Sequence, residues 1–550
     1  MNENATIIPH GGKVLVDALE VQGVQRVFCI PGESYLAALD GLFDSGIETI
    51  VARQEGGAAL MAEAHGKLTG TPGIAFVTRG PGATNASAGV HVAFQDSTPM
   101  ILFIGQVASD QKDREAFQEV DYRAMFGPLA KWVAEVERVD RLPEYVSRAF
   151  HVAQSGRPGP VVLALPEDML SNPCTTAALP QAVLPSGAAS TSDIDAILYE
   201  LERAERPFIL AGGSGWSSAA AEALADLAKA VHAPVGTSFR CQDFIDNRHP
   251  TYAGDVAIGI NPRLAERIKT SDLVLCLGPR LGEMTTGGYT LLTPPKAKQR
   301  LIHVHADPSE IGRVYHPDLS VAASASAVVR QLAGAVRAMR ADRAAYVAEA
   351  RAEYEAWQRP IETPGALKME AVIQYLSATM PDNMIIANGA GNYATWVHRY
   401  YCFRRYRTQL APTSGSMGYG LPAAIAAKLH APEREVICVA GDGCLQMVVQ
   451  EFGTACQYGA SVIVLVANNG FYGTIRMHQQ RKFAGRPSGT ALKNPDFAAL
   501  AHAYGGFGQR VDRTEAFPAA LAAARVSKQP AILDLQMSPD ALSPALISSE

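Results

Sequence analysis

Short runs of apolar residues recur along the chain, and longer stretches rich in alanine separate them. Each run has the length of one buried strand: Gly73–Val77, Met100–Ile104, Val161–Leu165, Phe208–Leu210, Leu273–Leu277, Leu301–Val304, Met384–Ala387, Val436–Ala440 and Val462–Val466. Strands that are apolar on both faces are typical of parallel sheets covered by helices. The pattern therefore predicts an α/β protein made of doubly wound parallel-sheet domains.

Two stretches interrupt this pattern, and we interpret them as linkers. Residues 172–192 are rich in Pro, Ala, Ser and Thr, whereas residues 341–364 begin as a charged helix and end in a proline-containing segment. A chain of 550 residues is too long for one hydrophobic core. Cutting the chain at these linkers predicts three α/β domains, at 1–175, 190–340 and 365–550.

The first and third of these predicted domains echo each other. The segment that begins at Glu55 reads as a small-residue helix, a break, a strand and then Gly-x-Gly, and the segment that begins at Ser414 follows the same order. Two related domains in one chain are the natural explanation of such an internal repeat.

The amino-acid composition excludes several classes of protein. With 48% hydrophobic residues and a net charge of −6, nothing points to nucleic acid or a membrane as a partner. None of the eight cysteines forms a C-x-x-C pair, which argues against a thiolate zinc site and indicates a reducing, cytoplasmic compartment. No secretory signal or membrane-spanning run is recognised. The arginine- and aromatic-rich stretch 399–407 is interpreted as an interface or ion-pair segment rather than a nucleic-acid surface.

The strongest local signal of chemistry is a Gly-Asp-Gly tripeptide around Asp442, which follows one predicted strand, while Asn469 follows the next. Residues 445–458 have the length of a helix that opens directly after the glycines. Because such a strand–helix–strand unit has parallel strands, Asp442 and Asn469 are expected side by side at the carboxyl edge of the sheet. Glycines at a helix start suit a phosphate, and these side chains with the carbonyl of Phe471 suit Mg²⁺. The alternative is two plain turns.

This spacing of Gly-Asp-Gly and Asn-Asn closely resembles the cofactor motif of thiamine-diphosphate enzymes, and the resemblance extends over nearly the whole chain. Within that superfamily the chain looks most similar to the acetolactate synthase and pyruvate oxidase group. The resemblance implies a pyrimidine-binding, a middle and a diphosphate-binding domain, with thiamine diphosphate and Mg²⁺ as cofactors. It also implies an enzyme that makes or breaks a carbon–carbon bond in 2-oxo acids.

The resemblance assigns roles to particular residues. Glu55 matches the catalytic glutamate that drives the aminopyrimidine into its imino tautomer; its alternative role is to stabilise a helix start. Met417 matches the wedge that bends the cofactor, although it would also serve as core filling, and the Gly415 carbonyl accepts from the amino group. The other residues implied in cofactor binding are Asn85, Gln106, Gly391, Asn392, Asp442, Gly443, Cys444 and Asn469.

The chain departs from acetolactate synthases in the part of the site that receives the second substrate. Met284 stands where those enzymes carry an arginine that holds the carboxylate of a second keto acid, and methionine cannot form that clamp. A family tryptophan is matched by His478 and a family histidine by Leu60. Glu33 and Ser34 match side chains that face the reacting carbon, and Glu33 is either a second acid–base group or a plain helix-start residue.

Four functions therefore stay open: a carboligase that joins a 2-oxo acid to a carbonyl acceptor, a decarboxylase or 2-hydroxyacyl lyase, an FAD-dependent oxidase, and a silent homologue. Retention of Glu55, Asp442 and Asn469 argues against the last. The middle domain of this group holds FAD in some members, and FAD is less expected here than its absence. The resemblance also implies a cofactor between the first domain of one chain and the third of another, hence a homodimer at least and a homotetramer by preference.

Overall fold

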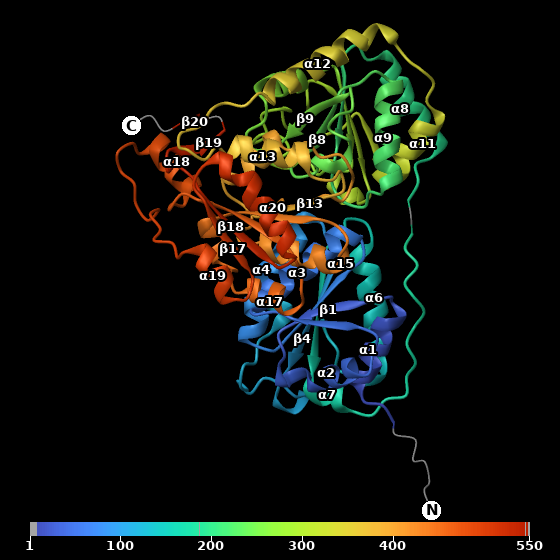
Figure 1. Cartoon of the computed structure of the whole chain (residues 1–550). Helices are drawn as coiled ribbons and strands as arrows, with labels where there is room; N and C mark the ends of the chain where they lie inside the picture. Colours follow the sequence, from blue (N-terminus) through green and yellow to red (C-terminus); the bar gives the residue numbers. More distant parts are fainter. Residues whose placement is uncertain (1–7, 186, 545, 548–550) are drawn as a thin grey trace, which may run out of the picture. The chain divides into compact units, whose positions relative to one another are not determined.

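The computed structural model describes residues 8–185, 187–544 and 546–547, and its main strands form three six-stranded sheets (Figure 1). Every strand pair within these three sheets is parallel. The predicted fold class, three α/β domains with parallel sheets, is thereby confirmed. The chain divides into two compact units: one contains the residues up to Pro185 with 425–430 and 450–458, and the other contains the rest.

The first sheet has the strand order β2-β1-β3-β4-β6-β5. Helices α1 and α6 share one apolar core with one face of the sheet, and α3 and α4 pack together and against β3. The strands are β1 (Arg26–Cys29), β2 (Glu48–Val51), β3 (Gly73–Val77), β4 (Met100–Gln106), β5 (Trp132–Glu135) and β6 (Pro160–Pro166), and the helices are α1 (Gly11–Val21), α2 (Leu36–Phe43), α3 (Glu55–Thr69), α4 (Pro81–Asp96), α5 (Tyr122–Phe126), α6 (Leu142–Gln154) and α7 (Glu167–Ser171).

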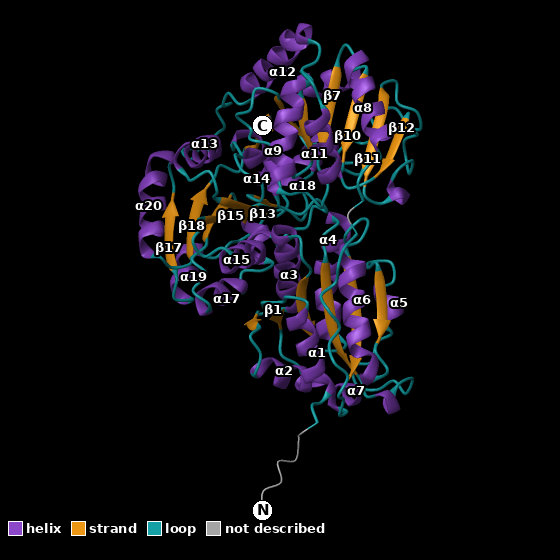
Figure 2. Cartoon of the chain, turned by 90° about the vertical axis from the view of Figure 1, so that its right-hand side faces the viewer, coloured by secondary structure: helices purple, strands orange, loops and turns teal. Residues whose placement is uncertain are grey.

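The second sheet has the order β12-β11-β10-β7-β8-β9 and carries helices on both faces (Figure 2). Side chains alternate between the faces along β7: Ile209 packs with α8, α9 and α11, whereas Phe208 and Leu210 pack with α10. The strands are β7 (Pro207–Ala211), β8 (Val235–Ser238), β9 (Tyr252–Val256), β10 (Leu273–Leu277), β11 (Arg300–His305) and β12 (Leu319–Ala322), and the helices are α8 (Thr191–Arg203), α9 (Ser218–Ala230), α10 (Pro262–Thr270), α11 (Ala325–Ala335) and α12 (Ala344–Trp357).

The third sheet has the order β14-β13-β15-β16-β18-β17, which repeats the order of the first sheet strand for strand. The sequence echo between the first and third predicted domains therefore has a structural counterpart. The strands are β13 (Ile385–Asn388), β14 (Gln409–Leu410), β15 (Val436–Gly441), β16 (Ile463–Asn468), β17 (Phe507–Val511) and β18 (Ala531–Gln536), with α13 (Met369–Thr379), α14 (Tyr393–Tyr400), α15 (Gly420–His430), α16 (Asp442–Gln446), α17 (Glu451–Gln457), α18 (Gly473–Lys482), α19 (Phe497–Ala503), α20 (Phe517–Ser527) and a small antiparallel pair, β19 (Ala541–Ser543) and β20 (Leu546–Ile547).

The prediction of one helix over 445–458 is wrong. Helix α16 begins at Asp442 and ends at Gln446, and α17 begins only at Glu451. The break has a tertiary cause, because residues 450–458 pack with the first unit whereas 431–449 belong to the second. Since α16 has only five residues, its dipole offers less to a phosphate than the longer predicted helix would.

Each of the two predicted linkers contains irregular chain, although α12 occupies much of the second. Residues 173–189 contain no helix or strand where the structure describes them, and α8 starts at a capping box formed by Ser190 and Asp193. After α12, residues 358–368 are again irregular. The exact boundaries at 1–175, 190–340 and 365–550 stay a prediction. Over the residues described, we find no helix that is both long and apolar enough to cross a bilayer.

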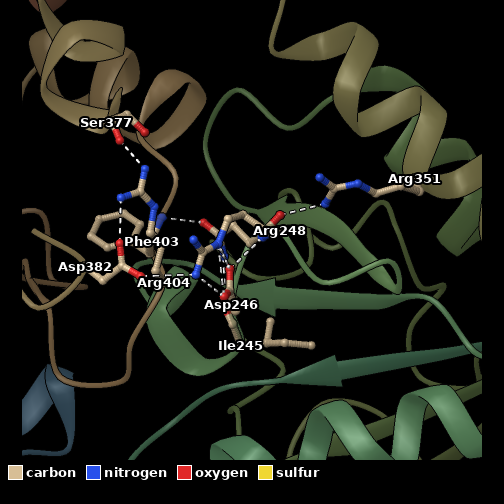
Figure 3. Close-up of polar contacts among 9 residues, drawn as sticks. Ile245, Asp246, Arg248, Arg351, Ser377, Asp382, Phe403 and Arg404 are labelled. Atoms are coloured by element: carbon tan, nitrogen blue, oxygen red, sulfur yellow. Dashed lines mark hydrogen bonds and ion pairs between the residues drawn. The ribbon is translucent and has the colours of Figure 1, made fainter. Parts of the chain in front are cut away.

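The arginine- and aromatic-rich stretch 399–407 makes intramolecular polar contacts, as predicted for an ion-pair segment (Figure 3). Arg404 donates to the carboxylate of Asp382 at 2.8 Å and also to the carbonyl of Ser377. The backbone N–H of Phe403 donates to Asn247 Oδ1 at 2.9 Å. These contacts tie the segment to the end of α13 and to the loop after β8, all within the second unit.

Candidate active site

The candidate residues fall into two groups, one in each compact unit, and each group is described by itself. They lie where strands end or helices begin, which is where ligands bind in open α/β sheets. The first unit contains Glu33, Ser34, Glu55, Asn85 and Gln106, and the second contains Met284, Gly391, Asn392, Gly415, Met417, Asp442, Gly443, Cys444, Asn469, Phe471 and His478.

Glu55 is the first residue of α3, and its carboxylate is held by the neighbouring helix. Asn85 on α4 donates from Nδ2 to Glu55 Oε2 at 2.9 Å. A Cβ atom added to Gly82 would lie 3.4 Å from Glu55 Oε1, so the glycine loop that opens α4 lies against the same carboxylate. The structure therefore brings the predicted catalytic glutamate together with Asn85 and the Gly-rich loop, which lie about 30 residues further along the sequence.

Glu33, Ser34 and Gln106 are held by contacts within their own domain. The Glu33 side chain is 67% exposed and pairs with Arg79 at 3.3 Å. Ser34 is fully buried and its hydroxyl bonds to Thr78 Oγ1 at 2.9 Å. Gln106 donates to the carbonyl of Val120 at 3.0 Å, while its own oxygen accepts from the next backbone N–H. The predicted substrate roles of Glu33 and Ser34 and the cofactor role of Gln106 stay predictions.

Glu451 was not among the predicted residues, yet it holds the start of α3. Its carboxylate is fully buried and accepts the backbone N–H of Arg53 at 3.1 Å and the hydroxyl of Thr454 at 2.7 Å. A Cβ atom on Gly57 would lie only 2.3 Å from its Oε1, so glycine is required there. Burial raises the pKa of Glu451. The positions of Arg53 and Gly57, on both sides of Glu55, therefore depend on this carboxylate. No local sequence pattern predicts the contact.

In the second unit, Asp442 lies at the carboxyl end of β15 and is buried, with 3% of its surface exposed. Its carboxylate accepts from the backbone N–H of Gly443 and of Gly470, each at 2.8 Å, and from Asn494 Nδ2 at 2.7 Å. Because Gly470 directly follows Asn469, the two predicted strand ends do meet. Asn494 was not predicted, because it reaches this edge only through the fold of the loop that precedes α19.

Cys444 joins three loops of the second unit. Its sulfur accepts from the backbone N–H of Gly418 and from the hydroxyl of Tyr393, both at 3.1 Å. Burial raises the pKa of Tyr393, which keeps the hydroxyl protonated as a donor. Gly391 has φ +149°, and a Cβ atom there would lie 2.8 Å from the Tyr393 ring, so this position requires glycine. The segments that follow β13, precede α15 and follow β15 therefore converge, while the cofactor roles of Gly391 and Cys444 stay predictions.

The remaining candidates of this unit lie on its loops and on α18. Asn392 donates its backbone N–H to Thr474 Oγ1 at 2.9 Å and its side-chain Nδ2 to the carbonyl of Leu542 at 2.8 Å. Met417 is half-buried and packs on the apolar core of the third sheet, next to the exposed Gly415. Met284 is half-buried in the loop after β10, and His478 is exposed on α18. Their contacts with cofactor or substrate stay predictions.

The chemistry of this edge fits a divalent cation beside a phosphate. Asp442 is a buried carboxylate that no lysine or arginine pairs with in the described part of the chain. The Asn469 amide oxygen accepts from the backbone N–H of Phe471 at 3.0 Å. The Phe471 carbonyl accepts from the backbone N–H of Gly473 at 2.8 Å. All three are hard oxygen donors of the kind that Mg²⁺ takes. The described residues hold no group of three or more His, Cys, Asp or Glu placed for a metal, and the candidate set contains only one carboxylate.

Comparison with known proteins identifies the class. Three family models match the chain in order: the N-terminal TPP binding domain of thiamine pyrophosphate enzymes at residues 9–125, their central domain at 194–332, and their C-terminal TPP binding domain at 389–535. The chain belongs to the thiamine pyrophosphate enzyme family. Within it the chain falls in the acetolactate synthase and pyruvate oxidase-like group, and it is a thiamine-pyrophosphate-dependent enzyme of the carboligase type.

Several curated relatives support this placement over almost their whole length. The chain is 31% identical to acetolactate synthase of Mycobacterium bovis, covering 96% of this chain and 88% of the relative. It is 30% identical to the acetolactate synthase large subunit of Haemophilus influenzae, covering 91% and 89%. It is also 30% identical to a probable acetolactate synthase large subunit of Methanocaldococcus jannaschii, covering 96% and 92%.

Proposed function

We propose that this chain is a Mg²⁺-dependent carboligase that removes CO₂ from a 2-oxo acid and joins the remaining acyl carbon to a carbonyl acceptor. One observation carries the proposal: the chain keeps both a glutamate that is fixed at a helix start by Asn85 and a buried aspartate that has no cationic partner among the described residues. The first suits proton sharing with the cofactor, and the second suits the metal that holds its diphosphate.

Each residue has a defined task in this proposal. Asp442, Asn469 and the Phe471 carbonyl would hold Mg²⁺, while Gly391, Asn392, Gly443 and Cys444 would face the diphosphate. When bound, thiamine diphosphate supplies the nucleophilic carbon and accepts the electrons released as CO₂ leaves. Glu55 would share a proton with the pyrimidine ring, and the bond from Asn85 fixes the direction of its carboxylate. Met417 and the Gly415 carbonyl would orient the cofactor.

The second substrate accepts the acyl carbon, and the sequence favours an acceptor without a negative charge. Met284 offers no positive charge to a second carboxylate, so we propose an aldehyde or a ketone rather than a second 2-oxo acid. The same substitution favours a second candidate function, a 2-oxo acid decarboxylase or 2-hydroxyacyl lyase, because that reaction needs no carboxylate-bearing acceptor. The product distinguishes the two functions.

The test is calorimetric titration of the metal-free protein with thiamine diphosphate, with and without Mg²⁺. We expect tight binding only with Mg²⁺, loss of that metal effect in Asp442→Asn, and nearly unchanged binding in Glu55→Gln. Pyruvate and larger 2-oxo acids are then supplied with and without an aldehyde, and CO₂ and products are followed by NMR. Glu55→Gln should release almost no CO₂. Failure of the assembled protein to bind thiamine diphosphate would refute the proposal, and free aldehyde as the sole product would favour the decarboxylase.

The proposal includes a cytoplasmic homodimer at least, and a homotetramer by preference. Glu55 and Asp442 lie in separate compact units, and the chemistry needs both. Light scattering of the cofactor-loaded protein tests this, since an active monomer would contradict it. FAD is not part of the proposed reaction, and visible flavin absorbance in the purified protein would point to the oxidase function instead.

A further inference from the structure

The loop between α18 and α19 returns to the metal edge of the third sheet and lies along the turn that follows β16. The backbone N–H of Leu492 donates to the carbonyl of Gly470 at 2.7 Å. Next to this bond, Phe471 forms an antiparallel bridge with Ala491. Residues 490–494, which we call the strap, are therefore paired with the turn that carries two of the three proposed metal ligands.

The strap ends at Asn494, whose side-chain amide is bonded through both its nitrogen and its oxygen. The Nδ2 atom donates to Asp442 Oδ2 at 2.7 Å and to Asn468 Oδ1 at 2.8 Å. The Oδ1 atom accepts from Gln446 Nε2 at 2.8 Å. These partners fix the orientation of the amide, because turning it over would place its oxygen against the carboxylate of Asp442.

A second amide anchors this arrangement to the sheet. Asn468, the last residue of β16, donates from Nδ2 to Asp534 Oδ1 at 2.9 Å. Asp534 is buried and lies on the neighbouring strand β18. A row of hydrogen bonds therefore runs across three adjacent strands, from the end of β15 through Asn494 and Asn468 to β18. All of these residues belong to the second unit.

The hydrogen bonds to Asp442 are divided unevenly between its two carboxylate oxygens. Oδ2 accepts two, from Asn494 and from the backbone N–H of Gly470, whereas Oδ1 accepts one, from the backbone N–H of Gly443. Each carboxylate oxygen offers about two acceptor positions. Among the described residues, these donors therefore fill Oδ2 and leave one position on Oδ1.

We propose that Asn494 is a positioning residue of the metal site: it occupies Oδ2 of Asp442 and thereby leaves Oδ1 alone to meet Mg²⁺. The inference rests on the proposed function, in which Asp442 holds that ion. A carboxylate that offers one oxygen suits the strict octahedral geometry of Mg²⁺, whereas Ca²⁺ accepts carboxylates through one oxygen or through both. Removal of a partner that orients a metal ligand commonly lowers metal affinity about 10- to 100-fold. Asn494 therefore sets how tightly the site binds Mg²⁺ and how strongly it prefers Mg²⁺ to Ca²⁺.

The binding test uses full-length, metal-free protein, titrated calorimetrically with thiamine diphosphate in the presence of Mg²⁺, of Ca²⁺ and of neither ion. Asn494→Leu keeps the approximate shape of the side chain and removes all of its hydrogen bonds. With Mg²⁺ the Kd for thiamine diphosphate should rise about tenfold or more. The rise should be smaller by about threefold or more with Ca²⁺, and without either ion the Kd should stay within about threefold of the wild type. A defect that only disturbed the loop would weaken binding equally under all three conditions.

Three further variants make the result specific to this contact. Asn494→Ser keeps one donor and should lose less Mg²⁺-dependent affinity than Asn494→Leu, and it also serves if the leucine variant fails to fold. Asp442→Asn/Asn494→Leu should bind thiamine diphosphate as Asp442→Asn alone does, because the amide acts through that carboxylate. Additive losses would show that it acts elsewhere and would overturn the assignment. Asn383→Ala changes an exposed asparagine of the same unit and should behave as the wild type does.

Hydrogen exchange of the protein without cofactor or metal tests the positioning itself. In Asn494→Leu the backbone amides of Gly470 and Leu492 should exchange about tenfold faster, because the strap loses the side chain that fastens it to the sheet. Unchanged exchange, or Mg²⁺-dependent binding as tight as in the wild type, would overturn the positioning role and leave the proposed function standing. A wild type that does not bind thiamine diphosphate would instead refute the proposed function, and the exchange rates would still decide whether Asn494 holds the turn.

Discussion

The contact between Gly57 and Glu451 allows a quantitative test of how the start of α3 is held. In Gly57→Ala, the new Cβ would lie 2.3 Å from Glu451 Oε1 and 2.6 Å from its Cδ, so the carboxylate must move by roughly 1 Å to reach ordinary contact. That movement stretches the bonds from Arg53 and Thr454, and each buried donor left unsatisfied costs about 1–3 kcal/mol. Alanine returns about 1 kcal/mol as the better helix former. We expect a net loss of about 2–3 kcal/mol in the local stability of the helix start.

The double variant makes the reasoning specific to this pair. Glu451→Ala alone should cost a similar amount, because it leaves the Arg53 N–H unpaired and opens a cavity. In Gly57→Ala/Glu451→Ala the new methyl group enters the space left by the carboxylate, so the two losses should fail to add by about 2–3 kcal/mol. Turnover should fall in these variants as well, because a shift of about 1 Å near Glu55 is enough to lower the rate on the order of 100-fold.

Native-state hydrogen exchange of the backbone amides of residues 53–60 is the appropriate assay, because a chain of several domains does not unfold in two states. A loss of about 2.7 kcal/mol corresponds to roughly 100-fold faster exchange. Gly334→Ala is the matched control: it is a helix glycine with nothing within 4 Å of the added Cβ, and it should not speed exchange in α11. Exchange in Gly57→Ala as slow as in the wild type, or strictly additive losses, would refute the reasoning.

Three further predictions follow from the same structure. Met284→Arg should raise the yield of ligated product from two 2-oxo acids relative to aldehyde acceptors, as measured by NMR of the products, and an unchanged ratio would remove Met284 from the acceptor site. Gly443→Ala should weaken thiamine diphosphate binding at least tenfold by calorimetry, because its Cβ would lie 2.5 Å from the Tyr472 ring. Burial raises the pKa of Glu451, so between pH 4.5 and that raised pKa the folded state binds more protons than the unfolded state. The stability of the wild type should therefore fall as pH rises through the raised pKa, and Glu451→Gln should lack this decline. Thermal midpoints that change with pH in the same way in both proteins would contradict this.

The strands that the sequence predicted well are those that lie inside a sheet. Gly73–Val77 and Leu273–Leu277 coincide with β3 and β10, because both faces of these strands are buried and the run is apolar throughout. The edge strand β17, Phe507–Val511, was missed since four of its five residues are partly or fully exposed. Strand β18 was also missed, and its apolar run is broken by Asp534, a buried acid that bonds to Asn468 at 2.9 Å.

The candidate site shows the same division between local and long-range information. Asp442 and Asn469 were predictable as neighbours because the crossover rule fixes which ends of parallel strands meet. Asn494 and Glu451 were not, because each reaches the site from a loop or helix whose own sequence carries no special pattern. The break between α16 and α17 belongs to the same category, since contacts of Glu451 with Arg53, about 400 positions away, decide where the helix starts again.

The shared strand order of the first and third sheets shows how one architecture carries two different halves of the chemistry. In the first sheet, the helix before β3 starts with Glu55. The loop after β3 contains Gly80 and Gly82, with no acidic residue between them. In the third sheet the helix before β15 starts among glycines, while the loop after β15 contributes Asp442. Neither domain therefore has both acids that the proposed reaction needs, one to share a proton and one to hold a metal. A chain that lost either domain would keep an intact parallel sheet but only one of the two acids, which is why the fold alone does not establish activity and why the proposed function rests on both acids.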